Sequence, residues 1–318
     1  MGELVPIKLM SYNVQGLSSV LLPIANLSAR IDHVANYVYN LVEKYKVDVL
    51  ILQEMFSSAL YQRVKQALSG VMRDTGIING VTCASPLYKF IDTLLRALNF
   101  ISSGIIIFSR HPILRVERLV FSSGIFPDSL SGKGAVVARI DVNGRLVDAI
   151  GTHLQAYDGE SAHVTRKLQI EELQQWINNN PDIGTVEGID IGTSKRVPIV
   201  LAGDLNCSVI QDPSLFEEMV QPLQRKLENT FGDGDPEPTF STSNDFCKYQ
   251  NDPNAYEHIY DYIFKDRSTV LIEKQSVVKD KLEEPFVVQK NAMRSDPSGV
   301  TPMYNVSDHL PIVSVIGI

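Results

Sequence analysis

The stretch Val197–Ser208, VPIVLAGDLNCS, begins as a run of apolar residues and ends in polar ones. Its apolar part has the length and composition of a buried β-strand. A carboxylate, Asp204, and a carboxamide, Asn206, follow directly. Because burying such groups costs free energy unless something binds them, we expect both side chains to lie at a functional site at the end of a buried strand.

The same pattern recurs at three other places in the chain. PIKLMSYN ends at Asn13, VDVLILQE ends at Glu54, and RLVDAIGTH ends at His153. In layered α/β proteins the loops at the carboxyl ends of the strands share one crevice. Residues that are far apart in the sequence are therefore expected to meet there.

A fifth segment, SDHLPIV, places Asp308 and His309 just before an apolar run. This order predicts a strand that enters the sheet at the same edge, which makes the sheet mixed. Each polar residue alone has an ordinary explanation as a helix cap, a turn residue or a structural histidine. Helix capping gives no reason for so many of them to share one edge, and their joint occurrence indicates a site.

Strand-like and helical patterns alternate along the chain, which favours a layered α/β fold. Asn143-Gly144 between GAVVARIDV and RLVDAIGTH predicts a tight hairpin turn. Apolar residues at helical spacing predict one helix that starts after Ser28 as N-cap and ends near Tyr45, and another over 162–178.

Three polar stretches, 181–196, 232–238 and 281–305, are predicted to be loops or insertions. None is long or biased enough to be a linker. We therefore expect one catalytic domain over residues 1–318.

The composition excludes some classes of function. With 318 residues, of which 44% are hydrophobic, the chain can bury a large core. It has 29 Lys and Arg against 37 Asp and Glu, a net charge of −8, and no basic block, so no nucleic-acid partner is expected. An acidic protein can still act on a phosphate ester if a divalent cation supplies positive charge locally.

The cysteines and the amino terminus are less informative. Cys83, Cys207 and Cys247 are odd in number and widely spaced, which fits neither a disulfide framework nor a metal knuckle. The segment MGELVPIKLM lacks the pattern of a signal peptide. It does not distinguish a soluble or peripheral membrane protein from a secreted one whose signal peptide has been removed.

The candidate residues have the chemistry of metal-assisted hydrolysis. Oxygen donors without a Cys/His ligand set indicate a hard cation, with Mg²⁺ favoured over Zn²⁺. Adjacent Asp308 and His309, with His153 elsewhere, supply groups that can activate water and stabilise developing charge. The pattern therefore predicts hydrolysis of a phosphate ester.

Seven segments carry a resemblance to a known superfamily. SYNVQGL, LILQEMF, GIIIFSRHPI, GTHLQA, LAGDLN, DYIF and SDHLPIV occur in the order found in the endonuclease/exonuclease/phosphatase superfamily. The resemblance extends from Ser11 to Val315 and, as a set, is specific. It implies an α/β fold of the DNase I-like type, a four-layer sandwich in which two packed mixed β-sheets are flanked by helices.

Within that superfamily the chain is similar to the neutral, Mg²⁺-dependent sphingomyelinases. HLQA followed by Arg166 and Gln169 resembles their pattern, and so does DSLSGKG, in which Asp128 stands five residues before Lys133. The resemblance implies a phosphodiesterase that hydrolyses sphingomyelin or a related phospholipid to ceramide and phosphocholine. Mg²⁺ would be the cofactor, with Mn²⁺ or Co²⁺ as substitutes.

Other branches of the superfamily fit less well. Inositol polyphosphate 5-phosphatases carry a Trp-rich motif where this chain has EHIYDYIF, and abasic-site endonucleases carry an Arg before the position of Asp261. Deadenylase-type nucleases share DYIF, so a nuclease or a phosphoinositide phosphatase remains an alternative. A non-catalytic membrane-binding module is a second alternative, although the retained polar set argues against it.

The resemblance also implies roles for the strand-end residues. Glu54 would bind Mg²⁺ directly, with Asn13 as a further metal-site residue. His309 would be the general base that takes a proton from the attacking water, oriented by Asp308.

The remaining catalytic residues implied by the resemblance surround the phosphate. Asp204 and Asn206 would position the water and the phosphate oxygens, and His153 would stabilise developing charge or assist the leaving alcohol. Lys133 is either a loop cation paired with Asp128 or a group that this pair places near the substrate.

Asp261 has two interpretations as well. It is either the partner of a histidine or an acceptor that closes the core at the start of a strand.

A lipid substrate implies a phospholipid membrane surface as partner, and we expect the protein to act there as a monomer. SPLYKFIDTLLRALNFISS has apolar residues on one helical face and is too polar to span a bilayer, so it would lie on the surface. An ordinary core helix is the alternative. The expected membrane contacts are Phe90, Ile91, Leu94, Leu98, Ile125 and Phe126.

Overall fold

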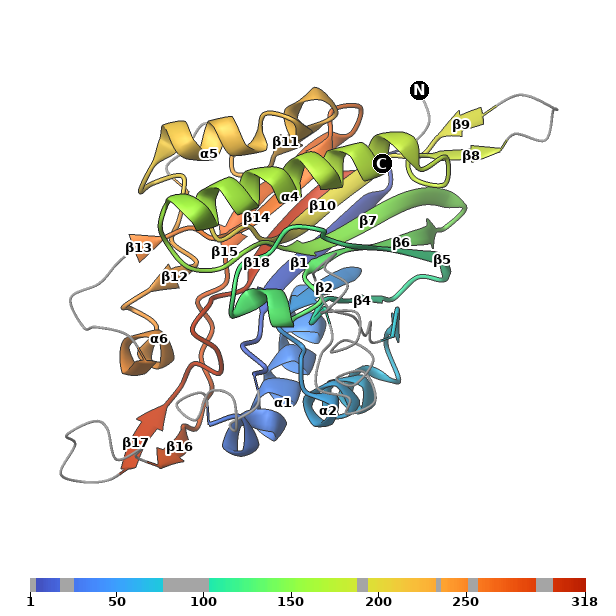
Figure 1. The fold of residues 1–318 in the computed structure, drawn as a ribbon. Helices are drawn as coiled ribbons and strands as arrows, with labels where there is room; N and C mark the ends of the chain where they lie inside the picture. Colours follow the sequence, from blue (N-terminus) through green and yellow to red (C-terminus); the bar gives the residue numbers. More distant parts are fainter. Residues whose placement is uncertain are drawn as a thin grey trace.

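The computed structural model describes residues 4–17, 26–76, 103–187, 194–232, 236–250, 257–289 and 300–318. Two six-stranded β-sheets pack face to face, and helices cover both outer surfaces (Figure 1). Both sheets mix parallel and antiparallel pairs. The expected four-layer arrangement is therefore confirmed.

The first sheet has the strand order β15-β18-β1-β2-β4-β3. Its strands are Val270–Val277 (β15), Ile312–Gly317 (β18), Pro6–Asn13 (β1), Val49–Gln53 (β2), Ile106–Ser109 (β4) and Arg73–Asp74 (β3). β1 and β2 are parallel, whereas β18 runs antiparallel to β1. The strand predicted to follow Asp308 and His309 therefore does enter the sheet from the edge at which β1 ends.

The second sheet has the order β11-β14-β10-β7-β6-β5. Its strands are Leu227–Asn229 (β11), Asp261–Asp266 (β14), Ile199–Asp204 (β10), Arg145–His153 (β7), Gly134–Val142 (β6) and Ile113–Val120 (β5). The predicted hairpin joins β6 to β7, and both of its turn residues have positive φ, 54° at Asn143 and 84° at Gly144. β10 and β7 form the parallel pair of this sheet.

Small and β-branched side chains fill the layer between the two sheets. The buried cluster there consists mainly of Val, Ile and Ala from both sheets. Gly151 lies in this layer, and a Cβ atom at that position would come within 2.7 Å of Ile51 Cγ2 and 2.9 Å of Ile105 Cγ2. The absence of a side chain there lets the sheets approach closely, which brings the ends of their strands together.

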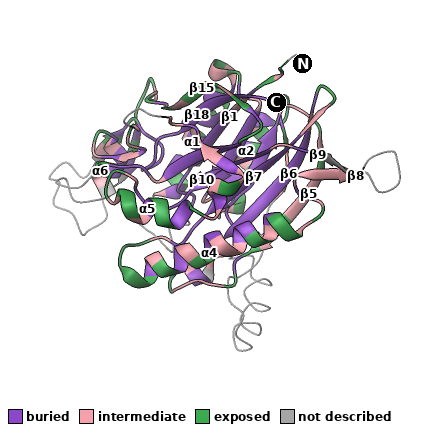
Figure 2. Ribbon diagram, turned by 90° about the horizontal axis from the view of Figure 1, so that it is seen from above, coloured by how far each residue is buried: buried purple, intermediate pink, exposed green. Residues whose placement is uncertain are grey.

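The helices form the outer layers, and their burial follows this arrangement (Figure 2). α1 (Leu27–Tyr45) and α2 (Ser58–Leu68) share one apolar cluster with the first sheet. α4 (Glu160–Asn179) and α5 (Pro213–Val220) share another with the second sheet. The helix predicted over 162–178 is thus confirmed, with slightly wider bounds.

The predicted N-cap of the first helix is wrong. α1 begins at Leu27, before Ser28, and Asn26 occupies the N-cap position with a left-handed backbone (φ 45°, ψ 41°) and no side-chain cap bond. Leu27 is buried in the same apolar cluster as the rest of the helix. Its burial favours a helix start two residues earlier than the cap preference of serine indicates.

Two of the stretches predicted as loops contain short hairpins. β8 (Thr185–Glu187) pairs with β9 (Ser194–Arg196), and β16 (Phe286–Gln289) pairs with β17 (Val300–Met303). Strands of three or four residues are too short to show a clear alternation of apolar and polar residues, so the sequence did not reveal them.

The remaining elements are small. They comprise η2 (Asp128–Leu130), η3 (Leu223–Arg225), α6 (Asp245–Gln250) and the pair β12 (Phe240–Ser241) and β13 (Glu257–His258). None of the helices that the structure describes combines the length and the apolar character needed to cross a bilayer.

The predicted amphipathic helix cannot be compared with the structure. Residues 77–102 lie outside the described residues, and with them the expected membrane contacts Phe90, Ile91, Leu94 and Leu98.

Candidate functional site

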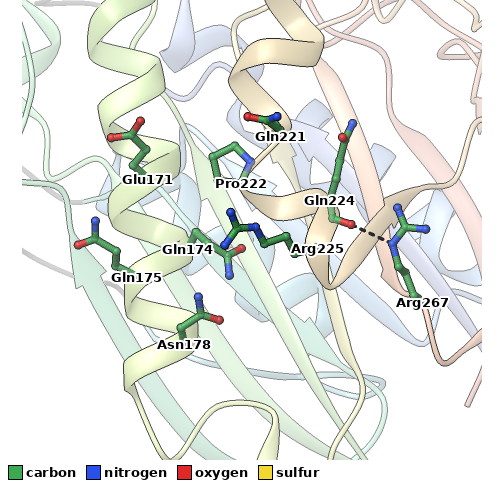
Figure 3. A pocket seen from close by; sticks show the side chains of 9 residues that line it. All are labelled: Glu171, Gln174, Gln175, Asn178, Gln221, Pro222, Gln224, Arg225 and Arg267. Atoms are coloured by element: carbon green, nitrogen blue, oxygen red, sulfur yellow. Dashed lines mark hydrogen bonds between the residues drawn. The ribbon is translucent and has the colours of Figure 1, made fainter.

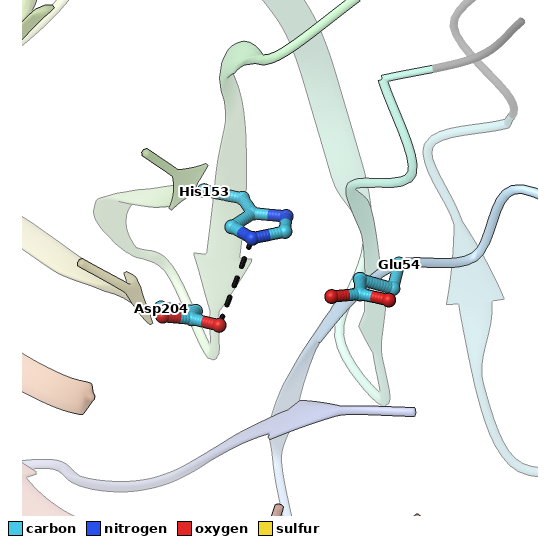
Figure 4. Close-up of side chains that lie close together, drawn as sticks. All are labelled: Glu54, His153 and Asp204. Carbon is cyan, nitrogen blue, oxygen red and sulfur yellow. Dashed lines mark ion pairs between the residues drawn. The ribbon is translucent and has the colours of Figure 1, made fainter. Parts of the chain in front are cut away.

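The strand-end residues of the two sheets meet at one edge of the sandwich. In the second sheet the register places Asp204 opposite His153 on one side and opposite Asp261 on the other. In the first sheet Asn13 is paired with Gln53, and Glu54 follows Gln53 directly. Figure 4 shows Glu54, His153 and Asp204 from three separate strands around one space.

A single buried amide joins the two sheets at this edge. Asn13 donates through Nδ2 to Glu54 Oε1 at 3.0 Å and to Asp204 Oδ2 at 2.9 Å. Its own Oδ1 accepts from the backbone N–H of Gln15 at 3.0 Å. Asn13 therefore holds two carboxylates from different sheets at a fixed separation.

The backbone at Glu54 is strained. Glu54 has φ 57°, in the left-handed region that residues other than glycine rarely adopt. Its carbonyl accepts from Gly16 N at 2.9 Å, and a Cβ atom at Gly16 would lie 2.5 Å from that oxygen. Strain of this kind costs about 1–3 kcal/mol and is common at functional sites, where it fixes the direction of a side chain.

The two carboxylates are in an unfavourable environment for negative charge. Burial, and then the negative charge of Asp308, raise the pKa of Glu54 to about 7. Burial also raises the pKa of Asp204 to about 6, although the charge of His309 opposes this. Glu54 Oε2 is buried and has no hydrogen-bond partner among the described residues.

These observations fit a divalent cation. Glu54, His153 and Asp204 each offer a ligand atom, and these atoms lie within 4.8 Å of one another. Two carboxylates with raised pKa values and an unpartnered buried oxygen are what a hard cation would stabilise. The residues present are therefore suited to hold Mg²⁺ or a similar ion.

The partner of His309 differs from the one expected. His309 Nδ1 lies 2.7 Å from Asp261 Oδ2, and its Nε2 lies 3.7 Å from Asp204 Oδ2. Asp308 does not contact the ring but accepts from Gln15 Nε2 at 2.6 Å. Of the two interpretations of Asp261, the structure shows the partnership with a histidine, and Asp261 rather than Asp308 makes the contact with the His309 ring.

The two histidines have opposite electrostatics. Burial opposes charge on His309, but the carboxylates of Asp261 and Asp204 outweigh it and raise the pKa well above 6.5. Burial, and then the charge of Lys133, lower the pKa of His153 well below that value. His309 is therefore the group prepared to hold a proton, and His153 is a neutral ring.

Lys133 lies beside His153 in the interior. Its side chain is 2% exposed, and Nζ contacts Asp128 Oδ2 at 2.7 Å, His153 Nε2 at 3.1 Å and Leu154 O at 2.7 Å. Both interpretations of Lys133 include its pair with Asp128, which the structure shows, and the burial of the pair distinguishes it from an exposed surface ion pair. The pair with Asp128 places a buried positive charge against the catalytic candidate His153.

Asn206 stands on a strained turn after β10. Its φ is 49°, its backbone N–H donates to Asp204 Oδ1 at 2.8 Å, and its Nδ2 donates to Leu154 O at 3.1 Å. The turn orients the Asp204 carboxylate and keeps the Asn206 amide at the same edge.

Sequence reasoning missed Arg30. This side chain is fully buried in α1 and donates to the carbonyls of Gln15, at 2.5 Å, and Val306, and its guanidinium lies 4.6 Å from the centre of the Phe246 ring. It joins the segment after β1 to the segment that carries Asp308. An arginine on the apolar face of a predicted helix was the available signal.

The loop before η2 carries the other two expected membrane contacts. Phe126 is 76% exposed, and Ile125 is partly buried. The Ile125 N–H donates to Gln155 Oε1 at 2.9 Å, so the loop is attached to the segment after His153. The exposed ring of Phe126 is available for a surface contact.

A surface cavity of about 560 Å³ opens elsewhere, between α4 and the segment that follows α5 (Figure 3). Polar side chains line it, among them Gln174 and Arg225. None of the strand-end residues contributes to it, so it is separate from the carboxylate cluster.

The chain is similar to known proteins over most of its length. Residues 10–309 match the Endonuclease/Exonuclease/phosphatase family. Sphingomyelinase C of Bacillus cereus is 26% identical over 98% of this chain and 88% of that protein. Phospholipase C of Staphylococcus aureus is 29% identical over 82% of this chain and 74% of that protein.

A solved structure shares the fold. A variant of beta toxin from Staphylococcus aureus, crystallised with bound magnesium ions, superposes with a TM-score of 0.73 at 23% identity, over 98% of this chain and 99% of that one.

The electrostatics of Glu54 give a prediction for the protein without divalent cations. Glu54→Gln should raise the free energy of unfolding by about 2–3 kcal/mol more at pH 8 than at pH 5. Since the pKa of Glu54 is raised to about 7, the native state keeps a proton that the unfolded chain releases near pH 4.3, and wild-type stability falls as pH rises between these values. Urea denaturation in EDTA at several pH values measures the difference.

Glu283→Gln is the control, because Glu283 is exposed. It should leave stability unchanged throughout. If Glu54→Gln shifted stability equally at pH 5 and pH 8, the raised pKa would not be the cause.

Proposed function

The chain belongs to the endonuclease/exonuclease/phosphatase family, whose match covers residues 10–309 of 318, and we propose that it is a divalent-metal-dependent phosphodiesterase that hydrolyses sphingomyelin or a related phospholipid to ceramide and phosphocholine. The observation that most strongly supports this proposal is the buried cluster in which Glu54, His153, Asp204 and His309 face one another. Relatives named sphingomyelinase C and phospholipase C support a phospholipid as substrate.

Glu54 would hold the cation, with Asp204 beside it and Asn13 fixing their separation. Mg²⁺ is the proposed ion, since the related beta toxin binds magnesium, and Mn²⁺ or Co²⁺ would be substitutes. When bound, the cation would offset the negative charge of the carboxylates and would therefore lower the pKa of His309. It would also polarise the phosphoryl oxygens.

His309 would act as the general base. Asp261 accepts from Nδ1, so Nε2 points toward Asp204 and can take the proton of the attacking water. Asp261 also stabilises the imidazolium that forms. Asp308 would act indirectly, through its bond to Gln15 and its charge.

His153 would stabilise charge on the reacting phosphoryl group or assist the departing ceramide oxygen. Lys133 lies against its Nε2 and supports negative charge that develops nearby. Asn206 would help to position the phosphate. Water attack with departure of the ceramide oxygen, which takes up a proton, leaves phosphocholine as the second product.

We also propose that the protein acts as a monomer on a phospholipid membrane surface. The exposed Phe126, on the loop attached to the segment after His153, supports the contact with that surface.

A substrate comparison tests the assignment. The purified protein would receive sphingomyelin, phosphatidylcholine, a phosphoinositide and an oligonucleotide, each with Mg²⁺ and with EDTA. We expect release of phosphocholine from sphingomyelin to exceed all other turnover and to require the cation. Preferential cleavage of the oligonucleotide, or unchanged turnover in EDTA, would contradict the proposal.

Two matched variants test the pairing of His309. Asp261→Asn should lower kcat about 100-fold or more, because the ring loses its charged partner, and should move the acidic limb of the kcat profile to lower pH, because a carboxylate that raises the pKa of His309 is removed. Asp308→Asn should have a smaller effect, since this carboxylate does not contact the ring.

The measurement is the pH dependence of kcat for both variants, with circular dichroism to establish folding. A larger loss in Asp308→Asn than in Asp261→Asn would restore the orienting role to Asp308.

A further inference from the structure

Tyr157 combines a fixed backbone with an exposed aromatic ring. Its φ is 73°, and the residue is 58% exposed. An exposed tyrosine in the left-handed region gains nothing from burial that would offset the strain. The surrounding structure must therefore impose this conformation.

Buried side chains hold the tyrosine in place. Arg166 on α4 is 4% exposed and donates through Nη1 to Tyr157 O at 2.7 Å and to Gln155 O at 3.0 Å. Gln169 on the same helix accepts from Gln155 N at 2.8 Å. The pattern HLQA followed by Arg166 and Gln169 is thus explained as the support of this segment.

The same segment is tied to the candidate active site. Asp128 Oδ2 accepts from Ala156 N at 2.6 Å and from Gln155 Nε2 at 3.2 Å. Asp128 also pairs with Lys133, which contacts His153. The position of Tyr157 relative to His153 is therefore set by direct contacts.

The carboxylates of Asp128 and Glu54 act electrostatically on the tyrosine. Partial burial, and then the negative charges of Asp128 and Glu54, raise the pKa of the Tyr157 phenol. The hydrogen bonds of Asp128 to Gln155 and Ala156 place the exposed ring on the segment that follows His153.

The next residue supplies negative charge. Asp158 is exposed and makes no hydrogen bond or ion pair in the part of the chain that the structure describes. Its charge contributes, after burial, to the raised pKa of Tyr260, whose ring lies 6.2 Å from that of His309. The charge of Asp158 also acts on Arg166, which holds the carbonyl of Tyr157.

We propose that Tyr157 and Asp158 bind the cationic head group of the substrate, a quaternary ammonium. This inference rests on the proposed function, because it assigns the part of the phospholipid beyond the phosphate. A large, weakly hydrated cation is attracted to an aromatic face. The exposed carboxylate of the next residue, Asp158, adds an opposite charge without requiring a hydrogen-bond donor, which a quaternary ammonium lacks.

Binding of two small ligands tests the proposal without turnover. Isothermal titration in Mg²⁺ would compare phosphocholine with methyl phosphate, which lacks the ammonium group. Wild-type protein should bind phosphocholine about fivefold or more tightly. Tyr157→Leu should reduce this preference toward one, Tyr157→Phe should keep it, and Asp158→Asn should weaken it.

Tyr39→Leu is the matched control, because Tyr39 is 38% exposed on α1, on the other outer layer. It should keep the wild-type preference. Retention of the full preference in Tyr157→Leu, or equal affinity of the wild type for both ligands, would overturn the proposal.

Hydrolysis assays separate this outcome from failure of the proposed function. In Tyr157→Leu, kcat/KM for 4-nitrophenylphosphocholine should fall at least fivefold, mainly through KM, while bis(4-nitrophenyl) phosphate should be cleaved as by the wild type. A loss only on sphingomyelin vesicles would assign the ring to membrane contact and overturn the head-group site. A wild type that prefers phosphocholine but does not cleave sphingomyelin would leave the head-group site standing and reject the proposed reaction.

Discussion

The site depends on one hydrogen-bonding group, the buried amide of Asn13, which donates to Glu54 from the first sheet and to Asp204 from the second. Two carboxylates that share a buried space repel each other, and burial disfavours the charge on each. The packing of the two sheets nevertheless brings them together, with Gly151 allowing the close approach of the layers. The fold thus maintains a concentration of negative charge that a bound cation would stabilise.

That charge explains the contrast between the two histidines. Asp261, Asp204 and Asp308 outweigh the effect of burial and favour the protonated form of His309, whereas burial, and then the charge of Lys133, keep His153 neutral. The two imidazoles are chemically identical, but their surroundings differ. His309 is therefore suited to act as a general base, and His153 to stabilise charge as a neutral group. The same arrangement lowers the stability of the protein without metal, as expected where a site is organised for binding rather than for folding.

The sequence predicted which residues form the site, but it did not predict all of the contacts between them. Apolar runs that end in Asn13, Glu54, His153 and Asp204 indicated the shared edge. The change from apolar to polar residues marks the end of a buried strand in the sequence alone. The partner of His309 was not predictable, since the chain bends over residues 306–308 and the sequence does not show to which partners the bend directs Asp308 and His309. Asp308 reaches Gln15, while His309 reaches Asp261. Arg30 was missed because it donates to backbone carbonyls, among them those of Gln15 and Val306, and such acceptors carry no sequence signal.

The central claim is that the carboxylates held together by Asn13 form a divalent-cation site. Anomalous diffraction from crystals soaked in Mn²⁺ tests it most directly, because the signal locates the ion without reference to activity. The account predicts an anomalous peak within ligand distance of the Glu54 carboxylate and beside Asp204. A saturated crystal with no peak there, or with manganese bound only to residues outside this cluster, would contradict it.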